Sequence, residues 1–229
     1  ALKIRQLYFY NRQHLKFSYE SPWGLRIGGG IKAESDEPTG DLAFYELGSG
    51  NLIKKIRTTE LNMSLKYQPG VTYINTKQKR VPINLDAPEF GLTHAMGLKG
   101  FLGRQYKYNL TQLSVYKRQW LGSWGSIDTH IKAGAQWNRV PFPLLIMPPV
   151  NPTYIENEET FSLMNNMEFL TDRYAFWSVT WDMNGKLLNR VPLIKHLKWR
   201  EYIAFKGMFG SLTDKNNPFL PQNALNTTM

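Results

Sequence analysis

The chain has 229 residues, with 28 Lys and Arg against 18 Asp and Glu, no cysteine, and aromatic side chains at 14% of positions. The lack of cysteine excludes disulfides and thiolate chemistry. No run of about 18 apolar residues occurs, which excludes a membrane-spanning helix. The formal net charge of +10 points to a polyanionic partner. Because the basic residues are spread along the whole chain without a nucleic-acid-binding motif, we expect lipid headgroups or lipopolysaccharide and no nucleic acid.

The first segments with strand character alternate between apolar and polar residues. In 14–19, the side chains of Leu15, Phe17 and Tyr19 share one face, and 25–33 continues the alternation after a Ser-Pro-Trp-Gly turn. A period of two residues places the apolar and polar sets on opposite faces of a β-strand. The polar stretch 34–56 that follows is predicted to be a long loop.

The clearest alternation lies in 57–67, where Leu61, Met63 and Leu65 are apolar and the residues between them are polar. Such segments extend over about 9–11 residues, the length that a tilted strand needs to cross a bilayer. Further strands are predicted at 91–102, 108–120, 126–137, 174–183 and 200–209, with connections at 69–88, 103–107, 121–125 and 138–172.

An apolar face opposite a charged face is typical of a barrel with lipid outside and water inside. Only closed strands satisfy every backbone group in lipid. Short and long connections alternate, as they do in outer-membrane barrels, except at 69–88 and 103–107. We therefore expect an all-β, antiparallel transmembrane β-barrel in the bacterial outer membrane. It forms one domain over 1–229 that is incomplete at both ends, with about eight strands of a larger barrel visible.

Basic residues recur on the predicted lumenal face of this barrel. A ring of like charge in a pore can select anions, whereas counter-charges such as Glu60, Asp128 and Asp182 favour a salt-bridged polar wall. The predicted lumenal basic residues are Lys16, Arg26, Lys32, Lys66, Lys99, Lys132 and Lys206.

Two connections are candidate contact surfaces. The segment 186–200 mixes leucines with basic residues, which suits a short structure on an anionic inner leaflet or a docking surface for a periplasmic partner. Pro192 limits any helix there to the residues after it. The predicted periplasmic contacts are Lys186, Arg190, Lys195, Lys198, Trp199 and Arg200. In the apolar run 141–150, the predicted external loop contacts are Phe142, Leu144, Leu145, Ile146 and Met147.

Motifs for catalysis and metal binding are absent from the sequence. The four histidines are not at metal-ligand spacing, and no nucleophile elbow or phosphate loop occurs. Glu168 and Asp172 are candidates for an acid/base pair, and the alternative is that Asp172 pairs with Arg173 at a loop–strand junction. We expect no enzyme activity, no cofactor and no metal.

Several short runs resemble a known family. They lie at 137–143, 159–161, 167–174, 188–193, 197–201 and 214–219. Together they resemble the C-terminal part of a Bacteroidota outer-membrane β-barrel family of unknown function, whose members carry an N-terminal carboxypeptidase-regulatory-like domain. The resemblance implies fold and location but no catalytic residues. That barrel is distantly similar to Omp85-type insertases, whose Arg-Gly-Phe-type loop signature does not occur in this sequence.

Three hypotheses of function follow. The leading one is a non-enzymatic outer-membrane barrel that acts as a subunit or accessory of an envelope assembly or export complex, with other outer-membrane or periplasmic proteins as partners. The first alternative is an outer-membrane channel for anionic solutes. The second is a soluble β-sandwich or calycin-like binding barrel whose apolar face packs inward.

Overall fold

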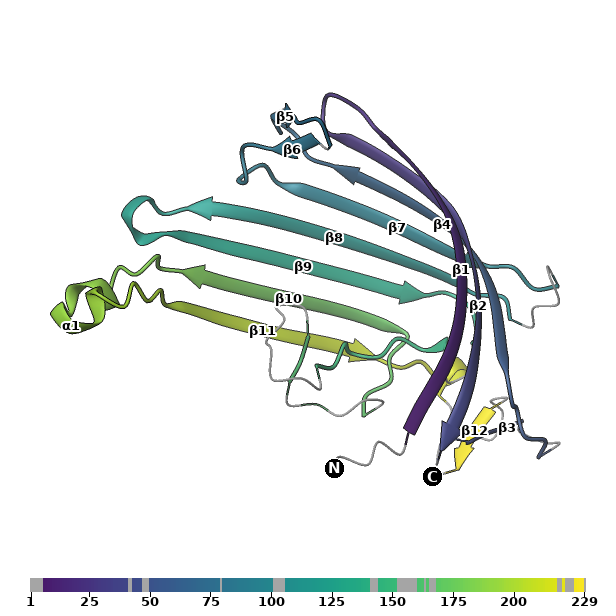
Figure 1. Ribbon diagram of the computed structural model, residues 1–229. Helices are drawn as coiled ribbons and strands as arrows, with labels where there is room; N and C mark the ends of the chain where they lie inside the picture. Colours follow the sequence, from purple (N-terminus) through teal and green to yellow (C-terminus); the bar gives the residue numbers. More distant parts are fainter. Residues whose placement is uncertain are drawn as a thin grey trace.

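One curved antiparallel sheet of eight strands forms most of the structure, a computed structural model (Figure 1). Each strand pairs with the next strand of the sheet along the chain, so the sheet is a meander. Its strands are β1 (Gln6–Glu20), β2 (Leu25–Gly40), β4 (Ile56–Tyr67), β7 (Glu89–Gly97), β8 (Asn109–Trp120), β9 (Ser126–Gln136), β10 (Arg173–Asp182) and β11 (Tyr202–Ser211). The structure describes residues 6–40, 43–46, 50–78, 80–100, 106–140, 144–151, 160–162, 164, 168–217, 220 and 225–228.

The smaller elements lie at the two ends of this sheet. β3 (Ala43–Glu46) pairs with β12 (Leu225–Thr228), and β5 (Tyr73–Asn75) pairs with β6 (Arg80–Pro82). The helical elements are the 3-10 turns η2 (Gly122–Trp124), η4 (Leu188–Arg190) and η5 (Asp214–Asn216), and the one-turn helix α1 (Pro192–Lys195). Of the helices described, none has the length and apolar character needed to cross a membrane.

The sheet curls without closing on itself within the described residues. β1 pairs with β2 and β11 pairs with β10, and these two outer strands are the edges of the sheet. The sequence-based fold class is therefore confirmed as all-β with one eight-stranded antiparallel sheet. Closure into a transmembrane barrel remains a proposal.

Strand ends differ from the sequence prediction at several places. The loop expected over 34–56 is wrong for its first seven residues, because β2 continues to Gly40 and pairs there with the start of β1. An Arg12–Glu34 ion pair joins the two strands across this extension. The connection 69–88 contains the β5–β6 hairpin, and β7 ends at Gly97 instead of continuing to 102. At Pro192 the helix α1 begins, as predicted from the fixed φ of proline.

The buried hydrophobic core is small and lies at the end of the sheet that carries the long connections. It consists of Ile56, Tyr108, Val140 and Leu145. Among the described residues, seven hydrophobic side chains are buried against thirteen polar or charged ones. A soluble domain buries mainly apolar residues. Among the described residues, the buried side chains are therefore mostly polar, and many large apolar ones are exposed.

Candidate functional site

The two faces of the sheet differ sharply in chemistry, as two adjacent cross-strand rows show. Directly paired residues of an antiparallel sheet share a face. One row, from β1 to β11, is Tyr19, Ile27, Leu65, Leu92, Leu113, Ala133, Ala175 and Phe209. The neighbouring row, on the opposite face, is Ser18, Gly28, Ser64, Thr93, Gln112, Gly134, Tyr174 and Gly210. The faces are called the apolar face and the polar face below.

Large side chains of the apolar face are exposed from one edge of the sheet to the other. Leu15 in β1 is 76% exposed, Leu113 in β8 is 55% exposed, and Phe209 in β11 is 75% exposed. Full burial of one such side chain is worth about 1.5–3 kcal/mol. Soluble monomers rarely expose a contiguous apolar patch of more than a few hundred Å². This face therefore requires an apolar environment.

Ion pairs line the polar face near the long-connection end of β1, β2 and β4. Lys32 Nζ lies 3.2 Å from Glu34 Oε2 and 3.4 Å from Glu60 Oε2. Arg12 Nε donates to Glu34 Oε1 at 2.9 Å, and the buried Tyr108 hydroxyl donates to Glu60. The carboxylates of Glu34 and Glu60 thus share two cations and a phenol, so positive and negative charges balance in this part of the polar face.

A second group of ion pairs lies towards the opposite end of the polar face. Arg118 makes a bidentate contact with Asp128, at 2.7 and 2.6 Å, and the Tyr116 hydroxyl donates to the same carboxylate at 3.0 Å. Lys66 Nζ lies 2.5 Å from Glu89 Oε1. Bidentate Arg–carboxylate pairs are among the stronger polar contacts in proteins. These contacts join β4 to β7 and β8 to β9 on the polar face.

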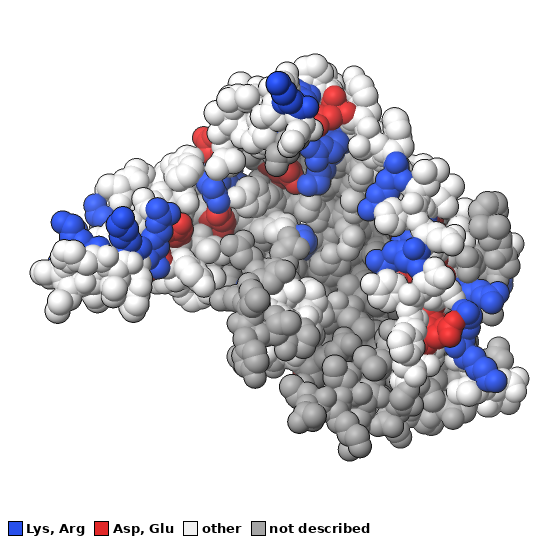
Figure 2. All heavy atoms as spheres, in the orientation of Figure 1, with Lys and Arg blue, Asp and Glu red and all other residues white. Residues whose placement is uncertain are grey.

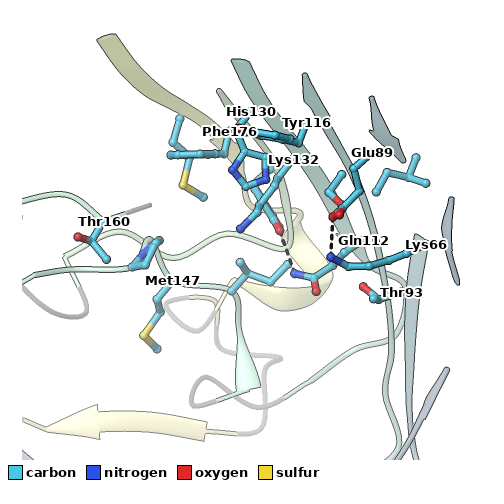
Figure 3. A pocket seen from close by; sticks show the side chains of 16 residues that line it. Lys66, Glu89, Thr93, Gln112, Tyr116, His130, Lys132, Met147, Thr160 and Phe176 are labelled. Carbon is cyan, nitrogen blue, oxygen red and sulfur yellow. Dashed lines mark hydrogen bonds and ion pairs between the residues drawn. The ribbon is translucent and has the colours of Figure 1, made fainter. Parts of the chain in front are cut away.

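A cavity of about 740 Å³ lies between the polar face and the segment that connects β9 to β10 (Figure 3). On the sheet side, Gln112 Nε2 donates to the Tyr174 hydroxyl at 2.9 Å, and His130 and Lys132 line the same space. Met147 and Thr160 lie on the other side, opposite the strands. A second hollow of about 550 Å³ over β1, β2 and β4 shares Thr93 and Gln112 with the first. The polar face is therefore hollowed along much of its width.

The β9–β10 connection lies against the polar face. Leu145 is buried in the small core, with Leu144 and Met147 packed against it, and Ile146 pairs with Thr171 by backbone hydrogen bonds of 2.9 Å in both directions. The ring of Phe161 contacts that of Phe176 in β10, with 5.9 Å between centroids. Of the predicted external loop contacts, Phe142 lies outside the described residues.

Asp172 fastens this connection to the segment that follows β11. Its carboxylate is fully buried and accepts hydrogen bonds from the Thr213 N–H (3.3 Å), the Thr213 hydroxyl and the Asn216 amide (2.9 Å). Asn216 Oδ1 in turn accepts from the Val140 N–H at 2.9 Å. The predicted pairing of Asp172 with Arg173 is wrong, because the buried Asp172 carboxylate is bonded to Thr213 and Asn216, whereas Arg173 is exposed. The acid/base pair of Glu168 and Asp172 has no support either, since Glu168 is exposed and Asp172 is fully buried.

Six of the seven basic residues predicted for the lumen lie on the polar face, as their register positions show. They are Lys16, Arg26, Lys32, Lys66, Lys132 and Lys206. Lys99 lies outside the sheet, because β7 ends at Gly97. Arg26 pairs with Glu20 at 2.8 Å. Lys32 and Lys66 are also in carboxylate pairs.

All the predicted periplasmic contact residues lie in the connection between β10 and β11, which projects beyond the strand ends (Figures 1 and 2). Lys186 Nζ donates to Ser123 Oγ at 3.0 Å and lies over the ring of Trp124. The five others are exposed: Arg190, Lys195, Lys198, Trp199 and Arg200. This end also carries the β5–β6 hairpin. Burial of the Tyr73 hydroxyl in this hairpin raises its pKa, and the negative charge of Glu20 raises the pKa further.

The part of the chain that the structure describes contains no candidate site for a metal ion. No group of three or more His, Asp and Glu side chains there is arranged to hold an ion.

An open antiparallel sheet with an exposed apolar face and a charged, hollowed polar face defines an all-β protein of unusual polarity. The chain belongs to the DUF5686 C-terminal domain, a family of unknown function, whose model matches residues 7–219. This confirms the resemblance to the C-terminal part of a family of unknown function. The bacterial group, the preceding regulatory-like domain and the likeness to Omp85-type barrels stay predictions. Comparison with curated proteins and with solved structures gave no match.

Proposed function

We propose that this chain forms the wall of a transmembrane β-barrel in the bacterial outer membrane. The apolar face lies against lipid, and the polar face lines the interior. The observation that carries this proposal is the apolar row that extends without a charged residue from Tyr19 in β1 to Phe209 in β11. The strands of the sheet have 9 to 16 residues, enough for tilted crossing of a bilayer.

The position of the β9–β10 connection supports the same arrangement. The β9–β10 connection, which packs against the polar face, leaves the apolar face to its surroundings. A soluble β-sandwich, with the apolar face turned inward, would need a second layer on that face. Within the described residues, the side chains of this face are exposed from β1 to β11. We therefore rank the soluble alternative behind the barrel.

We further propose that the barrel acts as a non-enzymatic subunit or accessory of an envelope assembly or export complex. The hollowed interior is narrowed by the β9–β10 connection, and the basic connection between β10 and β11 projects from the opposite end of the strands. Projecting connections on a rigid wall are where binding residues concentrate. Partners among other outer-membrane or periplasmic proteins would engage these connections.

A channel for anionic solutes is the second candidate, and the lysines of the polar face are the observation in its favour. Their pairing with carboxylates weakens it, because Arg26, Lys32 and Lys66 each lie within 3.4 Å of a Glu oxygen. A compensated wall has little net field with which to attract anions. Planar-bilayer conductance with a clear preference for anions would favour the channel over the complex subunit.

The test of the proposed function is purification of the full-length protein from its own membrane in a mild detergent. The barrel predicts that the protein stays in the membrane fraction after washing with high salt and urea. The role in a complex predicts that defined outer-membrane or periplasmic proteins co-purify in fixed proportion. Release into buffer without detergent would contradict the barrel, and a protein recovered alone would contradict the role in a complex.

A further inference from the structure

We propose that the connection between β10 and β11 is a docking surface for anionic phospholipid headgroups, a role that rests on the proposed barrel. The surface, called the basic tip below, consists of residues 186–200. Five of its residues are Lys or Arg and none is Asp or Glu. It is the part of the chain that would meet the leaflet at the end of the barrel where the short turns lie.

Apolar side chains of the basic tip are exposed to a degree that favours insertion into a membrane surface. Leu193 in α1 is 85% exposed, and Leu197 is 56% exposed. Val191 and Trp199 are exposed as well. Exposed apolar side chains beside basic ones are the pattern of segments that lie in the interface between lipid headgroups and acyl chains.

Four cations of the basic tip differ from Arg26, Lys32 and Lys66 of the polar face, which are each in a carboxylate pair. Arg190, Lys195, Lys198 and Arg200 are exposed, and within the described residues no ion pair involves them. The remaining cation, Lys186, is held over Trp124 by its contacts with η2. Figure 2 shows the basic side chains gathered at this end of the molecule. Such uncompensated positive charge is complementary to a surface of lipid phosphates.

The basic tip is a folded structure and not an extended loop. The Met183 N–H donates to the Glu201 carbonyl oxygen at 3.1 Å, and the Leu187 N–H donates to the Glu201 carboxylate at 2.6 Å. Between these two contacts the backbone forms successive hydrogen-bonded turns. In one of them the Lys195 N–H donates to the Val191 carbonyl oxygen at 2.9 Å. Side chains held in place in this way lose less conformational entropy on binding than those of a flexible loop.

Two tryptophans lie at the base of the basic tip. Trp124 and Trp181 lie with ring centroids 6.2 Å apart, and the Trp181 ring N–H donates to the Trp124 carbonyl oxygen at 3.0 Å. Trp181 lies on the apolar face near the end of β10, opposite Ile127 and Ile203. Trp and Tyr favour the level of the headgroups. The basic tip therefore begins at that level, where anionic groups are within reach.

The test places a fluorescent probe on the basic tip of the full-length protein. Because the chain has no cysteine, Leu197→Cys gives a single attachment site for an environment-sensitive dye. The labelled protein is reconstituted in phosphatidylcholine vesicles with and without phosphatidylglycerol, and the dye is quenched by lipids that carry a nitroxide. We expect stronger quenching with phosphatidylglycerol and a loss of the difference at high salt.

Two triple variants supply a matched comparison of charge. Arg190→Gln, Lys195→Gln and Arg200→Gln together remove three charges from the basic tip, and the docking equilibrium should weaken by about fivefold for each charge. Lys54→Gln, Lys99→Gln and Lys107→Gln remove three exposed charges at the opposite end of the sheet. In this control variant, the dye at position 197 should be quenched to the same extent as in the protein without the three substitutions.

A probe on the apolar face separates failure of this inference from failure of the barrel. A dye attached to Met63→Cys should be quenched by the nitroxide lipids in both vesicle compositions. Quenching at Met63 without quenching at Leu197 would overturn the lipid-docking inference, leave the barrel standing and assign the basic tip to a protein partner. Equal quenching at Leu197 with and without phosphatidylglycerol would overturn the selectivity for anionic lipid. Lack of quenching at Met63 would contradict the barrel itself.

Discussion

At the residue scale, Gly97 shows how the polar face requires a small side chain. A Cβ at this position would overlap the ring of Tyr108, which is buried and donates its hydroxyl to Glu60. We expect Gly97→Ala to displace the ring and to lower the free energy of unfolding by about 1–3 kcal/mol. Urea unfolding of the full-length protein in detergent micelles measures the change.

Gly29→Ala is the control for this prediction. Gly29 also lies inside a strand, but a Cβ there would meet only the Asn62 carbonyl oxygen, in ordinary van der Waals contact. Its effect should stay within about 0.5 kcal/mol. An equal loss of stability in the two variants would mean that the Tyr108 ring does not occupy the space above Gly97.

Asp172 is the second residue with a sharp expectation. Replacement by alanine removes the acceptor of three hydrogen bonds and leaves the buried Asn216 amide without its carboxylate. Hydrogen bonds to a charged group contribute about 1.5–3 kcal/mol each, and their effects are not additive. We expect Asp172→Ala to lower the free energy of unfolding by about 2–3 kcal/mol, measured in the same way.

A neighbouring contact provides the comparison for Asp172. Lys215 donates to the Trp137 carbonyl oxygen at 2.9 Å, but this bond is exposed. Lys215→Ala should change stability by no more than about 0.5 kcal/mol. If Asp172→Ala has an equally small effect, the link between the β9–β10 connection and the end of β11 does not hold the two together.

At the scale of elements, the register of β4 against β7 can be tested by a disulfide. Ser64 and Thr93 are directly opposite on the polar face, whereas Ala95 is opposite Asn62. A disulfide needs Cβ atoms about 3.5–4.5 Å apart, which directly opposed residues approach and diagonal ones, at about 7–8 Å, do not. Ser64→Cys with Thr93→Cys should oxidise fully, as judged by thiol loss in mass spectrometry.

The diagonal pair, Ser64→Cys with Ala95→Cys, is the control and should stay reduced under the same conditions. The pairing matters because the connection between these strands is long and includes the β5–β6 hairpin. The reverse outcome, with only the diagonal pair oxidised, would mean that β7 is shifted by two residues.

The strands of the sheet were predictable because each carries its own period of two. The alternation of Leu61, Met63 and Leu65 with polar residues predicts both the strand and its faces, and the register confirms the faces. The extension of β2 to Gly40 was not predictable in this way. Its residues are polar on both sides, so the strand there depends on pairing with β1 and not on local pattern.

The candidate site was predictable only in part, because contacts between distant segments leave no periodic signal. Lys32 and Glu60 were placed on one face by alternation, and the structure brings them within 3.4 Å. Arg12 and Glu34 were missed, since both lie beyond the ends of the predicted strands. Asp172 and Asn216 lie in runs that carry the family resemblance, but their contact spans 44 residues.

At the scale of the whole molecule, the central feature is a sheet with reversed polarity. More polar than hydrophobic side chains are buried among the described residues, and the large apolar ones are exposed from β1 to β11. In water this arrangement would leave the hydrophobic effect opposed to the fold. In a bilayer the same arrangement satisfies both faces, because lipid covers one and water or ion pairs cover the other.

The most direct test of this account is a single-cysteine scan of four consecutive residues in β4: Asn62, Met63, Ser64 and Leu65. The scan is performed on the full-length protein in its own outer membrane. Cysteines at 62 and 64, which lie on the polar face by their register with β2 and β7, should react with a water-soluble maleimide. Cysteines at 63 and 65 should resist the maleimide, and dyes placed there should be quenched by nitroxide lipids. Equal reaction of all four positions with the maleimide, or the opposite alternation, would contradict a transmembrane wall with its apolar face in lipid.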